Sequence, residues 1–130
     1  MSQILMAIAA IFGGLAVAGG AFASHALKAQ LSERALDIFE TGIKYQMYHA
    51  LALLLVSLLL TRATTGQGLL NATGILFIVG VVIFSGSLYA LSLTGIKWLG
   101  AITPLGGVAL IMGWVVLVIA ASKVSFTGNS

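Results

Sequence analysis

The stretch LLNATGILFIVGVVIFSGSLYALSL, residues 69–93, decides the fold class because no charged side chain interrupts it. A helix rises about 1.5 Å per residue, so roughly 20 residues cross a hydrocarbon core about 30 Å thick. Transmembrane β-strands alternate apolar and polar residues in short segments, and this stretch does not alternate. It therefore predicts a membrane-spanning helix.

Three further apolar stretches flank it, at residues 4–23, 45–61 and 99–121. The first and the last are long enough to span. The second is shorter, and it spans if Tyr45 and Tyr48 lie at headgroup level, where aromatic side chains gather. We therefore expect one domain, residues 1–130, of the all-α integral membrane class, with four transmembrane helices bundled in a lipid bilayer.

The composition excludes several other classes of protein. Hydrophobic residues make up 60% of the chain and charged residues only 7%, whereas a soluble domain is about 25% charged. The absence of Cys excludes a disulfide scaffold and a thiolate zinc site. The net charge of +3 is scattered around the helix ends and predicts no nucleic-acid partner. No acidic residue lies inside a span, so we predict no catalytic residue and no enzymatic activity.

Residues 32–44 are expected to form an amphipathic helix between the first two spans. Ser32 is placed to cap its N-terminus. At about 100° per residue, the apolar side chains fall on one face and the charged ones on the opposite face. This helix is too polar to span, so we expect it to lie along the interface or to cap the bundle. Gly42 is expected to let it bend into the second span.

The first span is rich in small residues at a spacing of four, a pattern that lets two helix backbones approach closely in lipid. Two readings of this pattern stay open: an interface between copies of the chain or with a larger membrane complex, and packing inside the monomer's own bundle. Gly106 and Gly107 likewise leave the first turns of the last helix without bulky side chains, so that another helix can approach closely. The predicted helix-packing residues are Ala10, Gly14, Ala18, Gly20, Gly106 and Gly107.

Span counting assigns most of the unusual polar residues to one end of the bundle. We call the end that holds both termini and the 62–68 loop side A, and the opposite end side B. The end of the first span, the start of the second, the end of the third and the start of the fourth all meet at side B. The candidate binding residues there are His25, Tyr45, Gln46, His49, Ser85, Ser87, Tyr89 and Thr103.

His49 is the ionisable residue that lies inside an apolar stretch, which makes it a candidate for function. With His25 it is a weak candidate ligand of a metal or haem, and alone it is a candidate proton acceptor or a donor to a lipid or quinone headgroup. The alternative is an interfacial imidazole bonded to a backbone carbonyl, to Ser85 or to Tyr89. A closed metal site needs more ligands than two histidines, so we predict no bound metal and no cofactor.

Four stretches together resemble a known family: GAFASHALK (20–28), TGIKYQMYHALALL (41–54), FSGSLY (84–89) and TPLGG (103–107). They are similar to the bacterial membrane family catalogued as domain of unknown function 423, whose animal relatives are called transmembrane protein 256. That family commonly has Gly-Ala before the histidine, where this chain has Ala23-Ser24. The resemblance implies a small four-helix inner-membrane protein with no agreed activity, and it supplies no catalytic residue.

Two indications of orientation disagree. Side B carries four basic residues and side A two, which by the positive-inside rule puts side B in the cytoplasm. Three of those four belong to a segment with matching acids. The resembled family tends to carry basic residues in the second loop and the C-terminal tail, which implies cytoplasmic termini, and this is the orientation we expect.

Three hypotheses of function follow. The first is a non-enzymatic accessory or assembly subunit, or a homo-oligomer packed through the first helix. The second is a binding or transport module for an apolar or lipid-like molecule, held near His25, His49, Tyr45 and Tyr89. The third is a haem- or metal-binding membrane redox protein that uses the two histidines.

Overall fold

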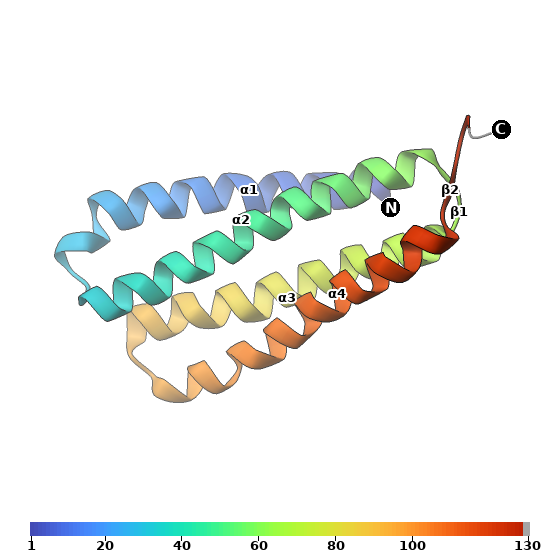
Figure 1. Ribbon diagram of the computed structural model, residues 1–130. Helices are drawn as coiled ribbons and strands as arrows, with labels where there is room; N and C mark the ends of the chain where they lie inside the picture. The colour runs from blue at the N-terminus through green and yellow to red at the C-terminus, as the bar shows by residue number, and fades with distance from the viewer. Residues whose placement is uncertain (129–130) are drawn as a thin grey trace.

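The computed structural model describes residues 1–128, which form four long helices lying side by side (Figure 1). These are α1 (Ser2–His25), α2 (Glu33–Arg62), α3 (Gln67–Thr94) and α4 (Thr103–Lys123). Two short 3₁₀ helices, η1 (Leu27–Ala29) and η2 (Lys97–Ala101), make the turns at side B. All four spans are long and apolar enough to cross a membrane, which confirms the predicted class.

The expected amphipathic segment 32–44 and the second span form one uninterrupted helix, α2. Ser32 caps it, accepting a hydrogen bond from the Ala35 N–H at 3.1 Å. The 30 residues of α2 extend over about 45 Å at about 1.5 Å per residue, which exceeds a hydrocarbon core of about 30 Å. The polar start of α2 therefore continues past the membrane core instead of turning along the interface.

The helix continues through Gly42 without interruption. This glycine makes room for a ring of α3, because a Cβ built there would lie 2.6 Å from Cε1 of Tyr89. The glycine thus serves contact between two helices, and the backbone of α2 stays helical through it.

α2 and α3 form the centre of the bundle, and α1 and α4 lie outside them. In the most apolar part of each span, 39% of the residues of α2 and of α3 are buried, against 17% in α1 and 22% in the fourth span. The core is filled by Leu5 of α1, Leu53 of α2 and Phe77 of α3, each almost fully buried. The outer faces of α1 and α4 are thus left for lipid or for another protein.

α3 and α4 pack closely because glycines stand where the two backbones meet. A Cβ at Gly106 would lie 2.7 Å from the Cα of Phe84, and one at Gly113 would lie 2.6 Å from the ring of Phe77. Such contacts leave no room for a side chain. Gly107, in contrast, would place a Cβ at an ordinary 3.8 Å from the Phe84 ring.

Side A ends in a short antiparallel pair of strands that the polar composition of the 62–68 loop does not suggest. β1 (Ala63–Thr65) pairs with β2 (Ser125–Phe126), and the Thr127 N–H donates to the Arg62 carbonyl at 2.9 Å. Gly66 follows β1 in the left-handed conformation with φ 75°. The pairing ties the C-terminal segment to the α2–α3 connection (Figure 1).

The fourth apolar stretch, residues 99–121, is not helical in one piece from its start. η2 includes its first residues, and α4 begins at Thr103 with Pro104 in its first turn. The cap position falls on Ile102 and carries no side-chain cap. The Thr103 hydroxyl bonds to Ser87 of α3 instead.

Candidate functional site

His49 lies near the middle of α2 and is 5% exposed. Its ring makes edge-on contacts with Phe77 of α3, at 5.2 Å between centroids, and with Trp114 of α4, at 5.9 Å. Both partners also lie near the middle of their helices. His49 thus sits halfway along the bundle, whereas His25 is the exposed last residue of α1. The structure separates the two histidines that span counting assigns to one end.

Both ring nitrogens of His49 have protein partners. Nδ1 lies 2.7 Å from the Tyr45 carbonyl, and the indole N–H of Trp114 donates to Nε2 at 3.0 Å. A carbonyl accepts and an indole donates, so these bonds assign a neutral imidazole with its proton on Nδ1. Because Nε2 already accepts a hydrogen bond, its lone pair is not available to a metal or haem unless Trp114 moves. Within residues 1–128, no three His, Cys, Asp or Glu side chains gather as a metal site.

A second chain of hydrogen bonds links three helices. The Gln46 amide N–H donates to the Phe12 carbonyl of α1 at 2.7 Å. The Tyr89 hydroxyl of α3 donates to Oε1 of Gln46 at 2.6 Å. Gln46 is 6% exposed, and such a buried amide costs free energy unless it is bonded. Its two bonds therefore hold α1 and α3 against α2.

The serines and the threonine of the candidate set are also bonded inside the bundle. The Ser85 hydroxyl donates to the Gly42 carbonyl at 2.7 Å. The Ser87 hydroxyl donates to the Phe84 carbonyl at 2.9 Å, which leaves the Thr103 hydroxyl to donate to Ser87 at 2.6 Å. These contacts link α3 to α2 and to α4.

Tyr45, like His25, is an exposed member of the candidate set, with 41% of its surface exposed on the outside of α2. Its ring lies 4.8 Å from that of Phe84 and 5.7 Å from that of Tyr48. This aromatic group is suited to packing against lipid or a partner helix.

The buried and half-buried members of the set, together with the 45% exposed Trp114, therefore form separate hydrogen-bonded groups that between them join all four helices. We call these groups together the polar network: Gln46, His49, Ser85, Ser87, Tyr89, Thr103 and Trp114. Its hydrogen bonds hold neighbouring helices in register in an apolar medium. Chemically, these side chains are engaged in fixed contacts between helices.

Sequence reasoning missed Trp114. A tryptophan in the middle of an apolar span carries an N–H that needs an acceptor, and this was the available signal. The acceptor is 65 positions away in the sequence, so the signal alone does not identify it.

The small residues of α1 fall on two different faces. Ala9 and Ala16 are buried against the bundle, while Ala10, Gly14 and Ala18 are exposed. A Cβ at Gly14 would meet nothing within 4 Å among the described residues. The row with the spacing of four at positions 10, 14 and 18 therefore points away from the monomer's own helices.

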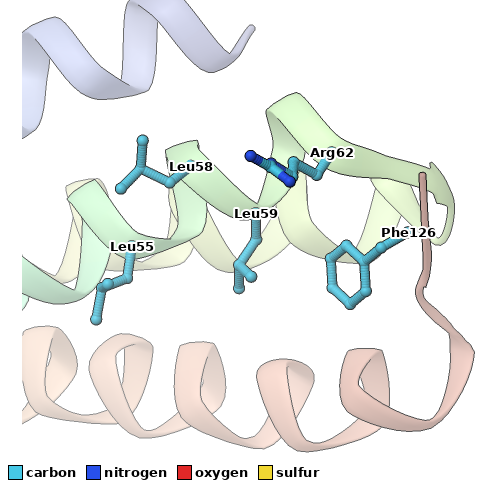
Figure 2. A pocket seen from close by; sticks show the side chains of 5 residues that line it. All are labelled: Leu55, Leu58, Leu59, Arg62 and Phe126. Carbon is cyan, nitrogen blue, oxygen red and sulfur yellow. The ribbon is translucent and has the colours of Figure 1, made fainter. Parts of the chain in front are cut away.

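Two adjoining grooves lie at side A, on either side of Phe126. One, of about 470 Å³, is lined by Leu55, Leu58, Leu59, Arg62 and Phe126. Figure 2 shows Leu55, Leu59 and the Phe126 ring directed to the same side of α2, with the Arg62 guanidinium at the end of the helix. The other, of about 330 Å³, lies between Leu59, Leu117 and Val124. Both grooves are lined mainly by apolar side chains.

A third cavity, of about 540 Å³, lies at side B between the start of α2, the end of α3 and η2. The linings of the three cavities include none of His25, Tyr45, His49 and Tyr89. The hypothesis of a lipid-like ligand held by those four residues therefore finds no hollow among these three in the described part of the chain.

The chain is similar to a set of membrane proteins from bacteria. The family model described as protein of unknown function, DUF423, matches residues 19–107. The UPF0382 membrane protein YwdK of Bacillus subtilis is 46% identical over 121 residues, which cover 93% of this chain and 98% of that protein. A UPF0382 membrane protein of Staphylococcus epidermidis is 46% identical and one of Staphylococcus haemolyticus 40%, each with 97% of its length covered. No solved structure matches the chain.

Proposed function

This chain belongs to the family of proteins of unknown function DUF423, and we propose that it acts in the membrane by association and not by catalysis. It is a non-enzymatic membrane subunit that pairs, through the outer face of α1, with a second copy of itself. The observation that carries the proposal is the position of the small residues of α1 with respect to the bundle.

The outer face of α1 is made of small side chains along its length. At about 100° per residue, the buried residues Leu5, Ala9, Ala16 and Ala23 centre on one direction, and the small residues centre on the opposite one. All of the latter are exposed. We call this set the small face: Ala7, Ala10, Gly14, Ala18 and Ala21.

Large side chains border the small face. Ile4, Ile11 and Leu15 are each about 60% exposed along one edge of it, so the small face forms a shallow groove beside an apolar ridge. In lipid there is no hydrophobic drive to join two helices, and close contact of small faces supplies the van der Waals attraction that replaces it. The ridge of one copy fits beside the small face of the other in a symmetric pair.

No contact with the described residues of the monomer explains why position 14 is a glycine. Glycine in a helix interior costs about 1 kcal/mol relative to alanine, and among the described residues nothing approaches a Cβ at this position within 4 Å. A second copy brings a backbone close to Gly14 and offsets that cost. The small face carries no charge, so two copies meet without repulsion.

The polar network supports the interpretation that the rest of the molecule, apart from the outer face of α1, has no catalytic role. Its hydrogen bonds are made within one chain. The three acidic residues, Glu33, Asp37 and Glu40, lie on the first part of α2, away from His49. Among the described residues, these carboxylates are therefore not paired with His49 for acid–base chemistry.

Single-cysteine crosslinking tests the pairing, because the natural chain has no Cys. Gly14→Cys and Ala10→Cys are expected to form disulfide-linked dimers under mild oxidation in membranes, because Cα atoms of a disulfide lie within about 7 Å. Val115→Cys, at a 53% exposed position near the middle of α4 and therefore away from α1, is the matched control and is expected to stay monomeric. Equal crosslinking at all three positions indicates random collision and overturns the proposal.

A bulky substitution provides an independent measurement. Gly14→Leu is expected to shift the detergent-solubilised protein from dimer to monomer in light-scattering measurements. Gly86→Leu is the matched control, since Gly86 is also an exposed helical glycine with nothing within 4 Å among residues 1–128. If Gly14→Leu leaves the dimer intact, α1 is not the interface.

We also propose that the protein lies in the inner membrane with cytoplasmic termini, as the family pattern of basic residues implies. Ser2→Cys at side A and Gln30→Cys at side B test this. With a membrane-impermeant maleimide added to intact cells, Gln30→Cys is expected to be labelled and Ser2→Cys protected. The reverse labelling pattern puts side B in the cytoplasm, as the count of basic residues favours.

A further inference from the structure

We propose that the side B cavity binds the phosphate group of an anionic phospholipid. The cavity, of about 540 Å³, opens where three segments meet: the first turns of α2, the last turns of α3 and the 3₁₀ helix η2. No residue of α1 lines it, so this site is separate from the proposed contact between copies.

Two cations line the cavity from different segments. Arg34 comes from the first turn of α2 and Lys97 from the start of η2, and no Asp or Glu is among the lining residues. Basic pockets between transmembrane helices bind anionic headgroups. The guanidinium of Arg34 is suited to two parallel hydrogen bonds to a phosphate, and the ammonium of Lys97 adds a compact point charge.

The start of α2 adds a further favourable term. The N-terminus of a helix carries a partial positive charge from its unpaired N–H groups. Ser32 lines the cavity and caps this end through the Ala35 N–H, so the cavity lies directly beside the helix terminus. The helix terminus and the two cations therefore both attract an anion.

The apolar part of the lining selects a lipid over a free anion. Ile38 of α2 and Leu91 of α3 line the same cavity as the two cations. Beside Lys97 in the sequence, Ile96 is 42% exposed and Trp98 is 64% exposed, which is typical of side chains at the membrane interface. A phospholipid places its phosphate at this level with glycerol and acyl carbons next to it. A free phosphate gains nothing from the apolar walls.

Native mass spectrometry of the full chain tests the site. The protein is released from mixed micelles containing equal amounts of phosphatidylglycerol and phosphatidylcholine, and the lipid that stays bound is counted. We expect phosphatidylglycerol to be retained preferentially. Arg34→Gln and Lys97→Gln are each expected to lower that preference about fivefold, because one cation near a headgroup contributes about 1 kcal/mol.

Lys44→Gln is the matched control. Lys44 is an exposed residue of the same helix, its substitution removes the same charge, and it does not line the cavity. It is expected to leave the preference within twofold of the natural chain. If Lys44→Gln lowers the preference as much as Arg34→Gln does, net charge explains the retention and the site is overturned.

Two other outcomes also decide the matter. Equal retention of the two lipids by the natural chain overturns the site. Inorganic phosphate, added at millimolar concentration as a competitor, is expected to displace little phosphatidylglycerol. If it displaces the lipid completely, the cavity is an anion site without lipid selectivity, and the assignment to a phospholipid is wrong.

Discussion

Replacing Trp114, a 45% exposed residue of α4, by Phe is expected to destabilise the bundle because it removes the hydrogen-bond donor to the buried His49. The substitution keeps an aromatic ring against Phe77, whose centroid lies 5.0 Å away. It removes the N–H that lies 3.0 Å from Nε2 of His49. Because His49 is only 5% exposed, water does not replace the lost donor, and Nε2 stays as a buried acceptor without a partner.

The expected magnitude is about 1–2 kcal/mol. An unsatisfied buried polar group costs about 1–3 kcal/mol, while hydrogen bonds between membrane helices contribute about 0.6 kcal/mol on average and at most about 1.7 kcal/mol. The unfolded chain in a micelle also finds partners for its polar groups, so the lower part of the first range applies.

Unfolding by SDS in mixed micelles, followed by far-ultraviolet circular dichroism, measures this change. Trp98→Phe is the matched control, because Trp98 is 64% exposed and an exposed substitution usually changes stability by less than about 0.5 kcal/mol. A loss no larger for Trp114→Phe than for Trp98→Phe refutes the role of this hydrogen bond.

A double-mutant cycle isolates the pair. His49→Leu removes the acceptor, and the double variant with Trp114→Phe removes both partners. Replacing both members of a buried pair costs less than the sum of the single losses. A coupling free energy near zero indicates that the two side chains act independently, contrary to the geometry.

Three further predictions follow from the same contacts. Gly106→Ala is expected to destabilise the bundle by about 1–3 kcal/mol, because its methyl group would overlap the backbone of α3. Gly86→Ala, at a position in open space, is expected to stabilise the bundle by up to about 1 kcal/mol. SDS unfolding measures both changes, and equal effects of the two substitutions contradict the close packing of α3 and α4. Tyr89→Phe is expected to cost about 0.6–1.7 kcal/mol in the same assay, since it removes the donor to Gln46, and an unchanged midpoint argues against that bond. Dialysis against a chelator is expected to leave the melting temperature unchanged, because both nitrogens of His49 are engaged, and a lowered melting temperature reveals a metal that the geometry does not predict.

Span number and helix starts follow from local physics and were predictable. An apolar stretch long enough to cross a bilayer is a helix because its backbone groups have no other partners in lipid. The cap at Ser32 is equally local, because the side chain bonds to an N–H three residues away.

The course of α2 was not predictable in the same way. The amphipathic pattern at 32–44 and the apolar run at 45–61 share one helical period, so no signal separates a bend from a straight continuation. Gly42 is compatible with both, and its role depends on Tyr89 from another helix. For the same reason the predicted position of His49 was wrong. Span counting takes residue 45 as the start of the helix and therefore assigns His49 to side B, whereas it lies near the middle of α2.

By itself, the sequence of this protein determined the membrane class, the number of spans, the absence of charge inside them and the presence of small residues in the first helix. These properties depend on residues close together in the chain. Only the tertiary structure decided which small residues face outward, that Trp114 bonds to His49, and that Arg34 and Lys97 line one cavity. The reason is that helix rotation and pairing are set by contacts between residues far apart in the chain, for which periodicity carries no information.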